Sequence, residues 1–373
     1  MASVLGFGSE KSPPWTLSPR YANLRPADSA RPSGATSVGR VSTEPAPTPA
    51  RSAGAATVLA RSRGELAVAL ADAPDPRAVV MTMGALHEGH FDLVREAARR
   101  VGPAGTVVVT IFVNPLQFAP TEDLDSYPRD LEGDLAGLTR TLTGVDGALS
   151  VGQLVVFAPT PEVIYPAGQP AVRIDPGPIA TVLEGRTRPT HFAGVCQVVL
   201  TLMHLTAPRW ALFGRKDAQQ LAIIESMVRD LAVPLEIVPV DIRRESDGLA
   251  MSSRNAYLSP EQRRQALALS RALQAGRDAA AQAAGSGTRL DPAAIRRAAL
   301  ASLEAADGVE IDYVALVDPA GFEDLTDAGL GLPRRAPVHE DAGEGLPAVG
   351  LLAVAVRVGT TRLIDNTLID LHP

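Results

Sequence analysis

Two histidines three residues apart, His87 and His90, are the side chains whose spacing points most directly to chemistry. An apolar run, residues 78–81, precedes them, and an amphipathic run, residues 91–98, follows. This order predicts a strand, a glycine-containing turn and a helix that starts at the histidines. Because a helix N-terminus favours anions through its N–H groups and its dipole, imidazoles placed there predict a phosphate-binding site.

Zinc is the competing interpretation of the same pair, because two histidines one helical turn apart can bind a metal ion. The H-E-x-x-H spacing is absent, and other ligands would have to come from distant parts of the sequence. The chain has a single cysteine, Cys196, which excludes a thiol-rich zinc site and an intramolecular disulfide.

Cations and hydroxyls occur in two later segments. Lys216, between Gly214 and Asp217 at the end of a predicted strand, is a compact cation suited to a phosphate oxygen. In residues 251–255, Met-Ser-Ser-Arg-Asn, hydroxyls stand beside a guanidinium, which suits an oxyanion clamp. For either segment alone, a polar surface turn is the simpler interpretation. No Walker A sequence is present, so phosphate binding through a P-loop is not expected.

Neutral amides form a further class of candidate. Asn114 and Gln117 follow the most apolar predicted strand, and Gln220 follows Lys216 on a predicted helix. Turn chemistry around Pro115 and an exposed helical face are the alternatives. Taken together, histidines, cations, hydroxyls and amides near successive strand ends predict an ATP site with a small polar substrate beside it.

The elements that would position these side chains are strands alternating with helices. This alternation predicts an α/β fold, a Rossmann-like doubly wound parallel sheet whose ligands bind beyond the carboxyl ends of the strands. Strands are predicted at residues 78–81, 107–113, 155–157, 210–213 and 235–240, and helices at 57–70, 91–98, 130–142, 194–205 and 218–231.

The pattern changes after residue 258. Residues 259–262 predict a helix start. Two helices, at 263–284 and 291–306, and three strands, at 311–317, 351–358 and 362–366, predict a smaller C-terminal α+β domain. We place the Rossmann-like domain at residues 56–242 and the small domain at 243–373. Residues 1–55 are rich in Pro, Ser and Ala and are expected to form a disordered extension.

Bulk composition excludes several classes of protein. The chain has 373 residues, enough for two domains, and its net charge of -7 argues against a nucleic-acid-binding protein. No apolar run reaches membrane-spanning length, so no membrane partner is expected. The single cysteine fits a reducing compartment, and we expect a cytoplasmic protein.

Several segments, in their order along the chain, resemble the pantothenate synthetase (pantoate–β-alanine ligase) family. So many motifs in one order make the resemblance highly specific. It runs from about Thr57 to the C-terminus and is carried by residues 82–90, 111–118, 127–129, 184–185, 188–189, 191–192, 213–214, 216–217, 219–220, 247–255 and 360–366.

The resemblance implies a Rossmann-like nucleotidylyltransferase domain with a small C-terminal domain, usually as a homodimer. It also implies ATP-dependent condensation of (R)-pantoate with β-alanine to pantothenate, AMP and pyrophosphate, with Mg2+ bound to the ATP. Pantoate carboxylate first attacks the α-phosphorus of ATP to give pantoyl adenylate. The amine of β-alanine then displaces AMP.

By the same resemblance, His90, His87 and Lys216 are the catalytic residues, with His90 as the proton donor. Gln117 and Gln220 are expected to hold pantoate, with Gln117 also near β-alanine and Asn114 supporting the pocket. The resemblance assigns no metal ligand. The residues expected to bind ATP are Met83, Gly84, Ala85, Leu86, His87, Glu88, Gly89, His90, Gly214, Arg215, Lys216, Asp217, Arg243, Met251, Ser252, Ser253 and Arg254.

Three positions depart from the family's usual pattern. Met81 stands where proline is general, Gly133 replaces an acidic residue ahead of Asp134, and Arg243 stands where the backbone usually contacts adenine. The glycine puts a metal-related role at that place in doubt. A backbone contact at Arg243 would survive the change of side chain.

Two other functions remain as alternatives. Another nucleotidylyltransferase of the H-x-G-H class would need a cationic pocket where Asn114, Gln117 and Gln220 stand, and neutral amides suit a hydroxy acid better. A non-catalytic nucleotide-binding protein would be expected to have lost some of the catalytic side chains, which are all present.

Overall fold

The computed structural model describes residues 56–119, 124–125, 127–286, 290–326, 330, 332 and 347–372. The predicted extension at 1–55 lies outside these residues, as do residues 331 and 333–346. In the described part of the chain, six strands form one sheet and three form another. No helix in this part is long and apolar enough to span a membrane.

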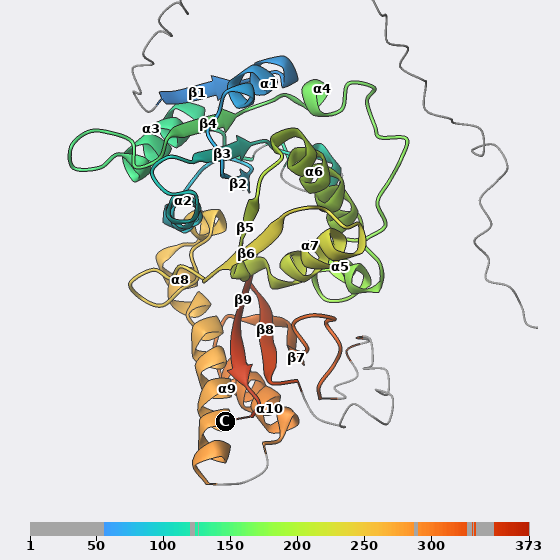
Figure 1. Cartoon of the computed structure of the whole chain (residues 1–373). Coiled ribbons are helices and arrows are strands. Elements are labelled where there is room, and N and C mark those ends of the chain that lie inside the picture. Colours follow the sequence, from blue (N-terminus) through green and yellow to red (C-terminus); the bar gives the residue numbers. More distant parts are fainter. Residues whose placement is uncertain are drawn as a thin grey trace, which may run out of the picture. The chain divides into compact units, whose positions relative to one another are not determined.

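The larger sheet is entirely parallel, and its strands follow the order β1-β4-β3-β2-β5-β6. From β2 the chain winds one way through β3 and β4 and then the other way through β5 and β6 (Figure 1). Such a reversal leaves a crevice beyond the carboxyl ends of the central strands. The strands are β1 (Ala56–Ala60), β2 (Arg77–Thr82), β3 (Thr106–Ile111), β4 (Gln153–Phe157), β5 (Trp210–Gly214) and β6 (Glu236–Val240).

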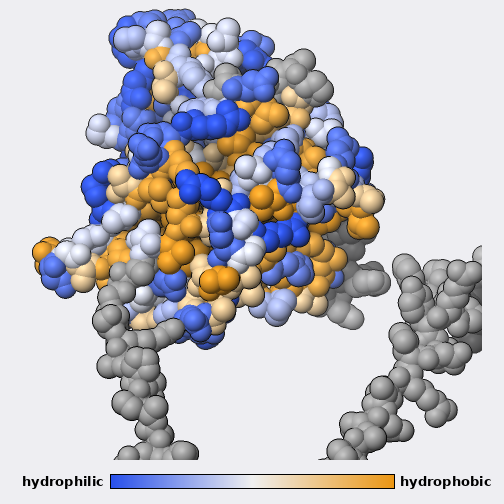
Figure 2. Space-filling model, turned by 90° about the horizontal axis from the view of Figure 1, so that it is seen from above, coloured by the Kyte–Doolittle hydropathy of each residue, from blue (hydrophilic) through white to orange (hydrophobic). Residues whose placement is uncertain are grey.

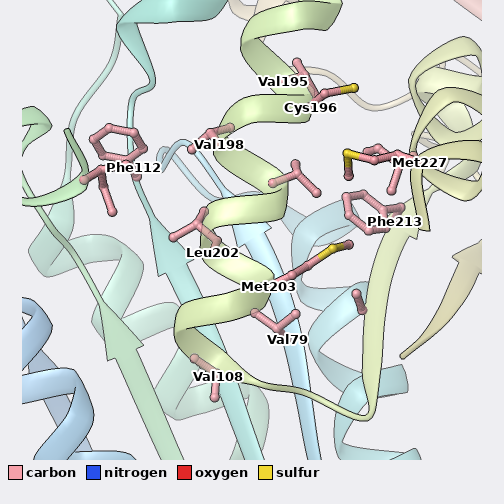
Figure 3. Close-up of a cluster of buried hydrophobic side chains, with 14 of the residues drawn as sticks. Val79, Val108, Phe112, Val195, Cys196, Val198, Leu202, Met203, Phe213 and Met227 are labelled. Atoms are coloured by element: carbon pink, nitrogen blue, oxygen red, sulfur yellow. The ribbon is translucent and has the colours of Figure 1, made fainter. Parts of the chain in front are cut away.

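Helices cover both faces of this sheet, because neighbouring residues of each strand point to opposite sides. Val79 and Val108 pack with α1, α6 and α7 on one face, and Figure 3 shows the apolar side of α6 against it. Val80 and Val109 pack with α2 and α3 on the other. The helices are α1 (Arg63–Ala71), α2 (Glu88–Val101), α3 (Leu131–Leu142), α4 (Pro161–Ile164), α5 (Glu184–Thr187), α6 (His191–Thr206) and α7 (Ala218–Asp230).

The smaller sheet is antiparallel, in the order β7-β8-β9, and α9 and α10 pack on one of its faces (Figure 1). Its other face meets the larger-sheet part of the chain, where Tyr313 and Ala315 share an apolar cluster with Leu183 and Ala222. The predicted fold class is confirmed, and the boundary between 242 and 243 stays a proposal. The elements are α8 (Pro260–Ala266), α9 (Ala268–Gly285), α10 (Pro292–Glu304), β7 (Glu310–Val317), β8 (Val349–Val358) and β9 (Thr361–Asp370).

Two predicted helices were wrong in extent. Residues 57–70 are not one helix: β1 occupies their start as an edge strand beside β4, and α1 begins only at Arg63. Ser62 and Glu65 form a capping box there, a signature that the sequence contains. The start signal at residues 259–262 is confirmed, because Ser259 caps α8, but the helix predicted to continue to residue 284 is interrupted at Leu267 between α8 and α9.

Candidate active site

The predicted site residues follow four neighbouring strands of the parallel sheet. The histidine loop (residues 83–90) follows β2, the amide turn (residues 114–117) follows β3, the lysine turn (residues 215–217) follows β5, and Arg243 follows β6. Since these strands are adjacent and parallel, their carboxyl ends open onto one crevice. A cavity of about 290 Å3 lies at this place.

Most of the predicted residues line this cavity. Gly84, Ala85, Leu86, Glu88 and Arg215 are not among its lining residues. The first three form the turn before the histidines, whereas Glu88 pairs with an arginine on α2 and Arg215 with an exposed aspartate. The predicted residues that do line the cavity are Met83, His87, Gly89, His90, Asn114, Gln117, Gly214, Lys216, Asp217, Gln220, Arg243, Met251, Ser252, Ser253 and Arg254.

A buried carboxylate on α3, Asp134, anchors the histidine loop. Its Oδ1 accepts the N–H of Leu86 at 2.7 Å, and its Oδ2 accepts the N–H of Ala85 at 3.1 Å. Gly84 and Ala85 have φ angles of +86° and +52°, so two successive residues adopt left-handed backbone. Burial raises the pKa of Asp134, and the two N–H groups oppose this effect. Sequence reasoning gave Asp134 no such role, because the contact joins residues 48 and 49 positions apart.

The two imidazoles lie against each other at the start of α2, with ring centroids 4.1 Å apart. His87 is the N-cap, and its Nδ1 accepts the N–H of Gly89 at 3.2 Å. Nδ1 of His90 accepts the N–H of His87, also at 3.2 Å. A ring nitrogen that accepts from an amide carries no proton, so the neutral form of each ring has its hydrogen on Nε2. Each histidine therefore has an Nε2–H to offer beyond its own loop.

Both histidines are neutral at pH 7. Burial lowers the pKa of His90 to about 3, with further lowering from His87 and Lys216 and an opposing effect of Asp217. Burial, followed by Lys216, also lowers the pKa of His87. A bound anion would raise both pKa values, because opposite charge favours the protonated ring. Before an anion binds, the pair offers hydrogen-bond donors without net charge.

The amide turn is held by its own asparagine. Asn114 is almost fully buried, and its amide donates to the carbonyl of Gly194 at 3.0 Å and to Oε1 of Gln117 at 3.3 Å. The hydroxyl of Tyr165 donates to its Oδ1 at 2.9 Å. Gly194 permits this approach of α6, because a Cβ there would lie 2.3 Å from the carbonyl oxygen of Leu116. Asn114 thus orients Gln117.

The lysine turn places one carboxylate among several cations. Nζ of Lys216 lies 3.8 Å from Oδ1 of Asp217. Desolvation raises the pKa of Asp217, but Lys216, Arg254, His191 and Arg188 together hold it below its ordinary value. The balance of charge around this carboxylate is therefore positive, as a site for a multiply charged anion requires.

The segment after β6 completes the cavity wall. Oγ of Ser252 accepts the N–H of Arg254 at 3.3 Å and so caps the short 3-10 helix Ser253–Tyr257. The carbonyl of Arg243 accepts the N–H of Met251 at 2.9 Å. Its guanidinium lies 3.3 Å from the carboxylate of Asp92 on α2. The unusual side chain at Arg243 is thus paired with α2, while its backbone stays in the wall.

Two further residues of the site, Arg188 and His191, were not predicted as site residues. Both line the cavity, and both contact the carbonyl oxygen of Gln117, at 3.3 Å from the guanidinium and 3.1 Å from Nδ1. They belong to segments that carried the family resemblance, so the signal was present without a role attached. A larger cavity of about 500 Å3 shares Arg188, His191 and Lys216 with the first and extends along β9.

One family of known proteins matches most of this chain. A family model described as pantoate-beta-alanine ligase matches residues 60–368. A pantothenate synthetase from Nocardioides sp. is 49% identical over 317 residues, which covers 83% of this chain and 85% of the relative. Pantothenate synthetase 4 from Frankia alni is 53% identical over 290 residues, covering 78% of this chain and 82% of the relative.

Solved structures give the same result. The pantothenate synthetase of Thermus thermophilus has a TM-score of 0.69 at 40% identity and covers 85% of this chain and 100% of its own. A pantoate-beta-alanine ligase from Francisella tularensis, solved with beta-gamma ATP and beta-alanine, has a TM-score of 0.59 at 27% identity, with coverages of 84% and 98%. The chain therefore belongs to the pantoate-beta-alanine ligase family.

Proposed function

We propose that this chain condenses (R)-pantoate with β-alanine at the expense of ATP, giving pantothenate, AMP and pyrophosphate. One observation carries the proposal: a single cavity holds the histidine pair and Lys216 beside the neutral amides of Gln117 and Gln220. N–H donors and a cation suit a triphosphate, and amides suit a hydroxy acid. Family membership supports the proposal, as does the Francisella relative solved with beta-gamma ATP and beta-alanine.

In the first step, a carboxylate oxygen of pantoate bonds to the α-phosphorus of ATP. The bond from this phosphorus to its bridging oxygen breaks, and pyrophosphate leaves with the electron pair. Negative charge grows on the phosphate oxygens, where fixed donors act with little reorganisation. We assign these donors to Lys216 and to the Nε2–H groups of His87 and His90. Since the pKa of His90 is about 3 in the absence of an anion, we infer that it acts first as a neutral hydrogen-bond donor.

We assign the remaining ATP contacts to the histidine loop, the lysine turn, Arg243 and residues 251–254. Asp217, beside Lys216, is placed to accept hydrogen bonds from a ribose. Gly84, Ala85, Leu86, Glu88 and Arg215 do not line the cavity, so their contribution is to shape the loop and turn that do. Gln117 and Gln220 are assigned to pantoate, with Asn114 supporting Gln117.

In the second step, the amine of β-alanine bonds to the acyl carbon of pantoyl adenylate. The bond from that carbon to the phosphate oxygen breaks, AMP leaves, and the amine loses a proton. Water would hydrolyse the same intermediate, so the cavity must be closed to solvent while the adenylate waits. Ser252, Arg254 and Asn255, together with residues 361–366 of β9, line the larger cavity beside this site.

The donor set fits a Mg2+ ion that arrives on the phosphates of ATP. Among the described residues, no group of three or more His, Cys, Asp or Glu side chains could hold a metal ion. The carboxylates that line the smaller cavity are Asp217 and Asp241. Mg2+ commonly binds one or two carboxylates together with substrate phosphates, and it neutralises phosphate charge there.

We further propose that the protein works as a homodimer in the cytoplasm, as the family resemblance implies. One face of the molecule carries hydrophobic residues across its middle between hydrophilic ones (Figure 2). Apolar surface of this kind is typical of a face that a second copy covers. Sedimentation of the purified chain tests the dimer, and a mass of one protomer at micromolar concentration would refute it.

An assay of product formation tests the proposed reaction. Purified protein is given ATP, Mg2+ and pantoate, with and without β-alanine, and pyrophosphate, AMP and pantothenate are measured. With pantoate alone, we expect one molecule of pyrophosphate to be released per molecule of enzyme. When β-alanine is added, we expect continuous release of AMP and pantothenate. Pyrophosphate that depends on a phosphorylated substrate instead of pantoate would favour the other nucleotidylyltransferase function. Binding of ATP without pyrophosphate under any of these conditions would favour the non-catalytic alternative.

A further inference from the structure

We propose that Asn366 on β9 is a positioning residue that fixes Lys216 across the junction between the two sheets. The inference rests on the proposed function, because it assigns Lys216 to the phosphates of ATP. It gives a role to the segment Thr-Thr-Arg-Leu-Ile-Asp-Asn, residues 360–366, which carries the family resemblance and has no place in the chemistry described above.

The contact is made by one amide group with two backbone carbonyls. Nδ2 of Asn366 donates to the carbonyl oxygen of Arg215 at 3.0 Å and to that of Lys216 at 2.9 Å. These carbonyls flank Cα of Lys216, so both ends of that residue's backbone are tied to the smaller sheet. The two hydrogens of a primary amide are both used, and no other neutral side chain of this size offers two donors from one nitrogen.

Asn366 is itself held firmly. It is 5% exposed and pairs in register with Ala353 in the centre of the antiparallel sheet. Its own N–H donates to Oδ1 of Asp365 at 2.8 Å. The carboxylate of Asp365 is in turn bound by both terminal nitrogens of Arg244, at 2.7 and 3.0 Å. Arg244 directly follows Arg243 of the cavity wall, so the chain of contacts returns to the site.

A purely structural role is the alternative, because other contacts also fasten the two sheets together. Arg362 forms a bidentate ion pair with Glu184, at 2.6 and 2.8 Å, and the hydroxyl of Tyr313 donates to the same carboxylate. That pair alone shows that the junction does not depend on Asn366. The distinctive property of Asn366 is that its acceptors belong to the lysine turn.

A shift of about 1 Å in a catalytic group can cost roughly 10²-fold in rate. Asn366→Asp keeps the shape of the side chain but removes both donors and sets carboxylate oxygens against the two carbonyls. We therefore expect roughly a 10- to 100-fold lower rate of pyrophosphate release in single turnovers with ATP and pantoate. Asn366→Ala, which loses the donors without the repulsion, is the second variant and should fall less far.

A double-mutant cycle separates positioning from general stability. If Asn366 acts through Lys216, Asn366→Asp should change the rate by less than about two-fold in a Lys216→Ala background, where the ammonium is already gone. Thr367→Val is the matched control: it removes a hydrogen bond from Arg277 at 2.8 Å on the next residue of β9, away from the lysine turn. This control should keep wild-type turnover.

These measurements distinguish failure of the positioning role of Asn366 from failure of the proposed reaction itself. If the wild-type protein releases no pyrophosphate with pantoate, the function itself fails. If the wild type is active, two results overturn the positioning role. One is an equal rate loss from Asn366→Asp in the wild-type and Lys216→Ala backgrounds, and the other is a loss of less than about two-fold in the wild-type background. Should the Asp variant not fold, as judged by its urea midpoint, the same cycle with Asn366→Ala decides the question by the same criterion.

Discussion

The two halves of the cavity are anchored in different ways. The histidine loop is fixed from within the Rossmann-like part of the chain. Asp134 on α3 accepts two backbone N–H groups of the loop, and the capping contacts of His87 and His90 orient the two rings. The lysine turn is fixed from the other sheet, where Asn366 binds its carbonyls. One anchor is an acceptor that holds donors, and the other is a donor that holds acceptors.

The two kinds of anchor respond differently to movement between the sheets. The histidine pair keeps its geometry whatever the smaller sheet does, because Asp134 and the capping contacts belong to the Rossmann-like part. The position of Lys216 depends on contact between the two sheets. We therefore expect removal of a histidine ring to act mainly on the rate of adenylation, and loss of the Asn366 contact to act on that rate through the position of Lys216.

Removal of a histidine should have the largest effect. His90→Ala deletes an Nε2–H donor, and loss of one such donor costs roughly 10²–10³-fold in rate. We expect adenylation to fall by that factor while the urea midpoint stays close to that of the wild type. His204→Ala on α6 removes an exposed histidine and serves as the control. Near-normal pyrophosphate release by His90→Ala would refute its assignment.

Breaking the anchor under the histidine loop should have the next largest effect. Asp134→Asn turns an amide NH2 towards one of the two N–H groups that the carboxylate accepts, so one buried donor loses its partner. We expect roughly a 10- to 100-fold slower adenylation and a loss of about 1–3 kcal/mol in unfolding free energy. Asp130→Asn changes the cap of the same helix without contacting the loop. Equal rates for the two variants would show that Asp134 only stabilises α3.

Breaking the ion pair at the junction should cost stability more than rate. Glu184→Gln removes the carboxylate that Arg362 and Tyr313 bind. Both members of the ion pair are mostly buried, so we expect a loss of about 1–3 kcal/mol by urea unfolding. The rate of adenylation should change by less than about three-fold, which corresponds to about 0.7 kcal/mol in the activation free energy, because this ion pair does not contact the lysine turn. A rate loss as large as that of Asn366→Asp would mean that any break at the junction disturbs Lys216.

Stability in acid tests the histidine loop without an activity assay. The pKa of His90 is about 3 in the folded chain and about 6.5 when unfolded, so between these values the unfolded chain binds a proton that the folded chain does not. The free energy of unfolding therefore decreases as pH falls from about 6.5 towards 3, because protonation favours the unfolded chain. His90→Gln, which does not titrate, should show a shallower fall of unfolding free energy between about pH 6 and pH 4. An unchanged slope would show that His90 is not held neutral by the fold.

Much of this molecule could be predicted from its sequence. The central strands are continuous apolar runs, and the groups with chemical function follow them directly, so a crevice at the strand ends brings them together. The anchors could not be predicted in the same way. Asp134 has the pattern of an ordinary residue of an amphipathic helix and Asn366 that of a polar residue in a strand, because their partners lie far away in the sequence.

Local signals also explain where prediction failed. The residues of β1, Ala-Thr-Val-Leu-Ala, suit a helix as well as a strand, and only pairing with β4 selects the strand. The capping box at Ser62 and Glu65 marks the true start of α1 and would have corrected the boundary. The interruption at Leu267 has no marker of this kind, since neither glycine nor proline stands there.

The hydrogen bonds inside the histidine loop also bear on which ions can compete for the site. A transition metal ligates an imidazole through an unprotonated ring nitrogen while the other nitrogen usually donates its hydrogen to an acceptor. Here Nδ1 of each ring already faces an amide hydrogen, so a metal at Nε2 would force a proton onto a nitrogen that meets another donor. The hydrogen bonds of the loop therefore disfavour zinc or copper at these rings, whereas each Nε2–H can still donate to an anion such as the phosphate proposed above.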